Sequence, residues 1–229
     1  MFCYGTFDKA EGVLFGQENF MNYIFGKLRM RWYIVALFAV AAGIYTGVVM
    51  CFDILKDTSF QDIGISYEWW VIFAVIVVVN CDKSWEAMLK CFVFFLISQP
   101  LVFAVQILFG TLAPDMGWNY YRSIWLPATF LTLPGGFIAY YCKKQNILGA
   151  MILGLGNTIQ ATLGVYYAAQ AIRSFPHHLL SSIVCFGSIY LMSFQIQRKK
   201  KTRLVSILIP VVFTVIIMVF CEISVLTLI

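Results

Sequence analysis

The stretch Ile147–Ile172, ILGAMILGLGNTIQATLGVYYAAQAI, decides the fold class of this chain. A helix rises about 1.5 Å per residue, so this stretch is long enough to cross a hydrocarbon core about 30 Å thick. Asn157 and Gln160 nevertheless stand near its middle, where lipid offers no hydrogen-bond partner. The stretch therefore predicts a transmembrane helix that faces other helices or a polar cavity rather than lipid alone.

The composition extends this prediction to the whole chain of 229 residues. It is 61% hydrophobic and 12% charged, with a mean hydropathy of +0.84, whereas soluble domains carry about 25% charged residues. We expect residues 32–229 to form one polytopic membrane domain. Residues 1–31 lack the pattern of a signal peptide and are expected to be a cytoplasmic segment, either an interfacial helix around Phe20–Phe25 or a poorly ordered tail.

Apolar runs predict an all-α membrane domain with seven transmembrane helices. The predicted spans are about Trp32–Phe52, Ile63–Cys81, Trp85–Gly110, Arg122–Cys142, Ile147–Ile172, Leu179–Gln197 and Leu204–Ile229. Pro134-Gly135-Gly136 predicts a bend or an interruption in the fourth span, which is either a transporter-like binding feature or an inert kink. Glu86 and Lys90, four residues apart, are expected to form a surface ion pair.

The basic residues predict the orientation. With seven spans, thirteen of the sixteen Lys and Arg residues fall on one face of the membrane. The positive-inside rule then places the N-terminus in the cytoplasm and the C-terminus outside, and the plasma membrane is the expected location. The run Arg198–Arg203 is expected either to bind anionic lipid headgroups or only to set this topology, and no nucleic acid is needed to explain it.

Uncharged polar residues gather at the predicted midplane and in the outer third of the spans. This layering predicts a pocket that is open to the outside and reaches mid-membrane. Its candidate substrate-binding residues are Asn157, Gln160, Tyr167, Gln99, Gln106, Pro134 and Glu222. Glu222 is the one carboxylate well inside a predicted span; it would bind a cationic group or carry a proton, or instead reach the outer interface or pair with Arg122 or Arg173.

Catalytic and metal-binding patterns are absent from the sequence. It contains no HExxH, GxSxG or Walker motif, and its seven cysteines form no CxxC. His177 and His178 are adjacent, so on a helix they would point about 100° apart and make a poor metal site. We therefore expect neither a metal nor a cofactor, and an enzyme only if Glu222, a histidine and a cysteine converge.

These features favour a transporter or channel-like protein for a small neutral or cationic solute. The alternative is a non-transporting membrane partner: a sensor, an immunity protein or an accessory subunit. Two rows of small residues, Gly43/Gly47 and Gly156/Gly164, bear on the choice. They predict either close helix packing inside the monomer or contact with a second copy or a partner subunit.

Overall fold

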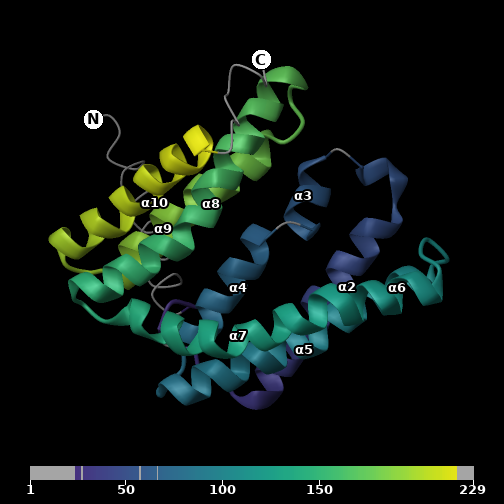
Figure 1. The fold of residues 1–229 in the computed structure, drawn as a ribbon, viewed down its shortest axis with the longest axis horizontal. Coiled ribbons are helices and arrows are strands. Elements are labelled where there is room, and N and C mark those ends of the chain that lie inside the picture. Colours follow the sequence, from purple (N-terminus) through teal and green to yellow (C-terminus); the bar gives the residue numbers. More distant parts are fainter. Residues whose placement is uncertain (1–23, 27, 57, 66, 221–229) are drawn as a thin grey trace, which may run out of the picture.

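The computed structural model describes residues 24–26, 28–56, 58–65 and 67–220, of which 84% are helical, with no strand among them. Figure 1 shows the arrangement. The helices are α2 (Trp32–Cys51), η1 (Asp53–Leu55), α3 (Ser59–Ile65), α4 (Tyr67–Val79), α5 (Ser84–Leu108), α6 (Pro114–Tyr120), η2 (Tyr121–Trp125), α7 (Leu126–Ala139), η3 (Tyr140–Lys143), α8 (Ile147–Arg173), α9 (Leu179–Ile196) and α10 (Lys200–Phe220).

The long helices form two bundles. In the first bundle α5 packs between α2 and α7, and in the second α8 packs between α9 and α10. The α3 and α4 helices lie between the two groups, where α4 contacts both α5 and α8 (Figure 1). By contrast, α5 and α8 do not pack against each other along their lengths. The fold is therefore two three-helix bundles that meet largely through the short helices α3 and α4.

Five helices of the described chain are long and apolar enough to cross a membrane: α2, α5, α8, α9 and α10. This confirms an all-helical fold of membrane-protein character. The other two predicted spans are each built from shorter pieces. The second is divided into α3 and α4, and the fourth, about Arg122–Cys142, runs through η2, α7 and η3 without a single long α-helix.

The α7 helix continues through Pro134, Gly135 and Gly136, so the predicted interruption is wrong, whereas the alternative, a bend, stays a prediction. The irregular turn of this segment lies earlier, in the π-helical η2. Pro127 follows that turn and has no N–H to donate to the carbonyl of Ser123 four residues before it, which explains a local departure from α-helical bonding. Gly136 serves packing instead, since a Cβ there would lie 3.1 Å from Cβ of Cys91 on α5.

Close packing of α2 on α5 accounts for the first small-residue row. A Cβ at Gly43 would lie 2.6 Å from the carbonyl oxygen of Ser98, and one at Gly47 would lie 2.7 Å from Cβ of Val105. Two glycines at this spacing let the two backbones approach more closely than larger residues would allow. Within the monomer this row is covered by α5.

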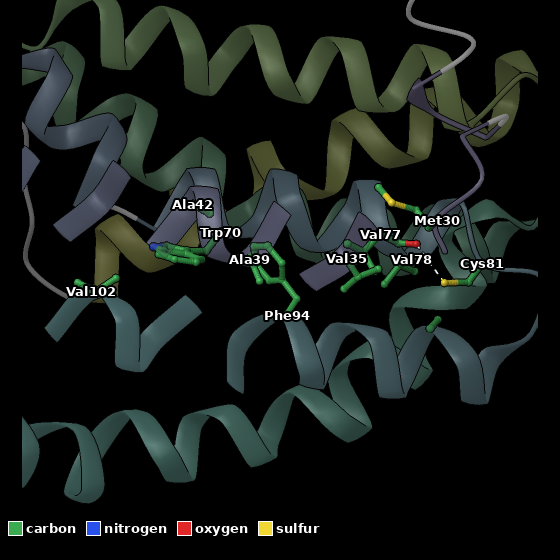
Figure 2. Packing of buried hydrophobic residues seen from close by; sticks show 11 residues of the cluster. Met30, Val35, Ala39, Ala42, Trp70, Val77, Val78, Cys81, Phe94 and Val102 are labelled. Carbon is green, nitrogen blue, oxygen red and sulfur yellow. Dashed lines mark hydrogen bonds between the residues drawn. The ribbon is translucent and has the colours of Figure 1, made fainter. Parts of the chain in front are cut away.

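The core of the first bundle is aromatic and extends to α4. Trp70 of α4 packs edge-on against Phe94 of α5, with ring centroids 6.0 Å apart, and Phe94 is fully buried. Figure 2 shows these rings beside Ala39 and Val35 of α2 and Val77 and Val78 of α4. This cluster attaches α4 to the first bundle.

The connections gather at two ends. At one end the amide of Leu28 donates to Oδ1 of Asn80 (2.9 Å), and Nε2 of Gln145 donates to the carbonyl of Ile196 (2.6 Å). This end, here called the basic end, carries eleven described basic residues: Arg29, Arg31, Lys83, Lys90, Lys143, Lys144, Arg198, Lys199, Lys200, Lys201 and Arg203. The opposite end, here called the acidic end, carries Asp53, Asp62 and Asp115 together with only three described basic residues, Lys56, Arg122 and Arg173.

Candidate functional site

Asn157 and Gln160 lie in the interior of the second bundle, and both side chains are fully buried. Asn157 Nδ2 donates to Oγ of Ser193 on α9 at 3.2 Å. Its Oδ1 has no hydrogen-bond partner in the described part of the chain. A buried carboxamide oxygen without a donor costs about 1–3 kcal/mol, so this atom marks a place where the polar interior is incompletely satisfied.

The same face of α8 continues toward the acidic end. Gly164 follows one turn beyond Gln160, and its carbonyl accepts from Oγ of Ser182 at 3.0 Å. A Cβ at Gly164 would lie 3.0 Å from Cβ of Cys185 on α9. Tyr167 comes next and is buried as well. Asn157, Gln160, Gly164 and Tyr167 are all buried, and α9 covers α8 near Asn157 and Gly164.

Tyr167 leads to a group of four side chains that we call the acidic-end cluster: Asp62, Tyr167, His178 and Ser181. Nδ1 of His178 lies 2.7 Å from Oδ2 of Asp62, and Oγ of Ser181 donates to the same oxygen at 2.7 Å. The ring of His178 is stacked on Tyr167, at 12° and 6.0 Å between centroids. The cluster joins α3 to α8 and α9 across the boundary between the bundles.

The backbone conformation of His178 fits its place in the acidic-end cluster. Its φ of 63° is left-handed, a conformation uncommon for a residue with a Cβ, and it directly precedes α9. Holding a side-chain-bearing residue there costs about 1 kcal/mol or more. The bond to Asp62 and the stack on Tyr167 offset this cost and fix the imidazole.

The cluster does not have the arrangement of a nucleophilic triad. Ser181 donates to the carboxylate of Asp62 rather than to the imidazole, so no base is placed to take its proton. Among the described residues, no group of three or more His, Cys, Asp or Glu is positioned to hold a metal ion. The geometry suits a hydrogen-bonded connection between helices.

The other predicted site residues lie elsewhere. Gln99 and Gln106 are buried in the first bundle, and Nε2 of Gln106 lies 3.5 Å from the sulfur of Met50 on α2 and 3.2 Å from the carbonyl of Val102. Pro134 is exposed on α7. Glu222 lies outside the described residues. The structure therefore does not bring all of the predicted site residues together, and the pocket they were expected to line stays a prediction.

Sequence reasoning missed the partners Asp62, Ser181 and Ser193. With seven spans, Asp62 and His178 both fall on the outer side of the membrane, and that shared side is the signal that could have suggested their pairing. Serine is common in membrane helices, so nothing in the sequence singled out Ser181 or Ser193.

Cavities occur at the basic end. One of about 450 Å³ is bordered by the α4–α5 turn, η3 and the end of α9, and its lining includes Asn80, Asp82, Lys143 and Arg198. A second, of about 750 Å³, lies on the other side of the same turn and is lined by the segment before α2. Neither contains a predicted site residue.

Polar side chains line both cavities: Asn80 and Asp82 border each of them, and Lys143 borders the first. Asn80 accepts from the amide of Leu28 and donates to the carbonyls of Ile24 and Ile76, the latter at 2.8 Å. Lys143 donates to the carbonyl of Cys81, which ties the α4–α5 turn to η3. Asn80 thus fastens the segment before α2 to the end of α4.

The expected surface pair of Glu86 and Lys90 is wrong in its setting. Lys90 is only 4% exposed, and its amine donates both to Glu86 and to the carbonyl of Met30. The segment before α2 covers it, which a helix pattern read alone could not show. Lys90, paired with Glu86, therefore holds the segment before α2 in place through its bond to the carbonyl of Met30.

Comparisons with known proteins give no relative for this chain. No protein-family model matches it, and neither a curated protein nor a solved structure is significantly similar. Its function must be argued from its own residues.

Proposed function

We propose that this protein is a small-solute transporter in which the two three-helix bundles move relative to each other, with solute passing along their boundary. The single observation that carries the proposal is the division of the fold into the α2–α5–α7 and α8–α9–α10 bundles, joined through α3 and α4. Many secondary transporters rock one bundle against another around a site near the midplane.

Polar groups beside this boundary support the proposal. Asn157 supplies an incompletely satisfied carboxamide inside the second bundle, one turn from Leu153, which packs in one cluster with Val75 and Val79 of α4. The acidic-end cluster connects α3 to α9 by the bonds of His178 and Ser181 to Asp62. Breaking those bonds would free the acidic end without disturbing the aromatic core of the first bundle. In this proposal the cluster holds the outer end closed, and the cavities at the basic end are the opposite opening.

The proposal includes the membrane topology. Seven traverses would place the N-terminus in the cytoplasm, the C-terminus outside, and the basic end on the cytoplasmic side of the plasma membrane. The gathering of eleven described basic residues at one end and the short connections there support this orientation. In the whole sequence the predicted outer side carries six acidic and three basic residues, which favours a neutral or cationic solute.

Water access at Asn157 tests the proposal. The seven native cysteines are replaced by alanine or serine, and Asn157→Cys is reconstituted in liposomes and treated with a membrane-impermeant thiol reagent. We expect labelling, because movement of α4 away from α8 would expose to water the face of α8 that carries Leu153 and, one turn later, Asn157. The matched control is Ile159→Cys on the outward face of the same helix, 45% exposed and expected to lie in lipid, which should not be labelled.

The result separates transport from the partner-protein alternative. A midplane that stays packed in every state would leave Asn157→Cys unlabelled, and the transport proposal would then be abandoned. If labelling occurs, proteoliposomes loaded with small amines, amino acids and sugars follow. Uptake by the wild type that is lost in a folded Asn157→Leu variant would identify the solute.

A further inference from the structure

A groove at the basic end combines apolar walls with unpaired positive charge. It has a volume of about 930 Å³ and lies where α8 and α10 begin side by side. Its lining residues are Gln145, Asn146, Ile147, Leu148, Lys199, Lys200, Lys201, Thr202, Leu204 and Val205. No acidic residue is among them, whereas both other cavities include Asp82.

The three lysines of the groove are available to a ligand. Lys199, Lys200 and Lys201 are exposed, and within the described part of the chain none of them pairs with a carboxylate. Arg203, in contrast, is folded back: its guanidinium lies 4.2 Å from the centre of the Phe194 ring and donates to the carbonyl of Gln197. Three cationic side chains of the run, those of its lysines, thus line the groove.

Helix geometry adds to this charge. The α8 helix begins at Ile147 and α10 begins at Lys200, so two helix N-termini with positive dipole ends open on the groove. In α8 the side chain of Asn146 already accepts from the amide of Gly149 at 2.8 Å. An anion at the groove would therefore meet mobile lysine side chains and the first turn of α10.

The apolar half of the groove points to a lipid rather than a soluble anion. Ile147, Leu148 and Leu204 are all more than half exposed, beside the lysines. A free phosphate has no apolar part that could contact these side chains. A phospholipid would cover them with an acyl chain while its headgroup met the ammonium groups, as lysines near a membrane surface favour.

We propose that this groove binds a phospholipid with an anionic headgroup, its phosphate at Lys199–Lys201 and an acyl chain along Ile147, Leu148 and Leu204. This site lies outside the boundary between the bundles, so it stands independently of the transport proposal. It converts the alternatives for Arg198–Arg203, lipid binding or topology alone, into a defined site.

The test measures lipid binding to the purified full-length protein in neutral detergent by native mass spectrometry. Dioleoylphosphatidylglycerol and dioleoylphosphatidylcholine share the same chains and differ in charge. The test variant is the triple substitution Lys199→Gln, Lys200→Gln, Lys201→Gln. The control is Arg29→Gln, Arg31→Gln, Lys83→Gln, which removes the same charge from exposed side chains at the same end but outside the groove.

We expect the wild type and the control to prefer phosphatidylglycerol, and the test variant to bind it about 100-fold more weakly, since each lysine near a surface contributes roughly a factor of five. Equal loss in both triple variants would mean that only overall charge matters and would overturn the site. Equal binding of the two lipids to the wild type would also overturn it. Full displacement of phosphatidylglycerol by glycerol 3-phosphate would show that the groove binds an anion without an acyl chain, which would contradict the proposal.

Discussion

Gly43 is the position where one added methyl group tests the packing of α2 on α5 most directly. In Gly43→Ala the new Cβ would lie 2.6 Å from the carbonyl oxygen of Ser98 and 2.9 Å from Cβ of Leu101. The nearer atom belongs to backbone in the middle of α5, which cannot turn aside as a flexible side chain would. The helices must separate by several tenths of an ångström, and Gly47 one turn later would lose its contact with Val105 as well.

Overpacking of this kind costs about 1–3 kcal/mol. For a chain of this size each kcal/mol corresponds to about 2–4 °C in melting temperature, so a decrease of roughly 2–12 °C is expected. The assay is thermal unfolding of the purified protein in one detergent, followed by circular dichroism or intrinsic tryptophan fluorescence. Trp70 reports on the aromatic core against which α2 packs.

The matched control is Gly156→Ala on α8. A Cβ at Gly156 meets nothing within 4 Å, and alanine is the better helix former, so the melting temperature should stay the same or rise. If the melting temperature of Gly43→Ala equals that of the wild type, or if Gly156→Ala lowers it more, then α2 does not pack on α5 as described. The Gly43/Gly47 row would then be open to a second copy or a partner subunit.

Three further predictions concern the basic end. Lys90→Ala should destabilise the protein by about 1–3 kcal/mol in chemical denaturation, because the carbonyl of Met30 and the Glu86 carboxylate lose a buried cationic donor. The control Lys83→Ala removes an exposed lysine and should change the stability little. Equal effects of the two substitutions would contradict the buried pairing. Asn80→Leu should speed hydrogen–deuterium exchange at the amide of Leu28 while leaving α8 protected. Unchanged exchange at Leu28 would refute the role of Asn80 in holding the segment before α2. In single-cysteine variants, maleimide should modify the partly exposed Cys51 and spare Cys81, because the thiol of Cys81 is buried and out of reach of the reagent. Rapid labelling of Cys81 would show that the α4–α5 turn is open.

Local features of the chain could be predicted because they depend on residues close in sequence. Hydropathy and run length predicted α2 and α8 almost to the residue, since a helix in lipid must satisfy its own backbone. At Pro134–Gly136 the breaker residues do not interrupt the helix, which is the one of the two predicted outcomes that the structure contradicts. Helix-breaking residues are tolerated inside a membrane helix when a neighbour packs closely, and α5 supplies that neighbour at Gly136.

The sequence alone determined that this is an all-helical chain of membrane-protein character, with its basic residues concentrated between particular helices and carboxamides buried in α8. Only the tertiary structure decided which faces meet. It set Gly43 against Ser98, buried Lys90 beneath Met30, and brought Asp62 within 2.7 Å of His178, 116 residues away. Such pairings depend on how each helix is rotated and which neighbour it has, and neither quantity is encoded in hydropathy, which records the depth of a residue in the membrane but not the direction in which it points.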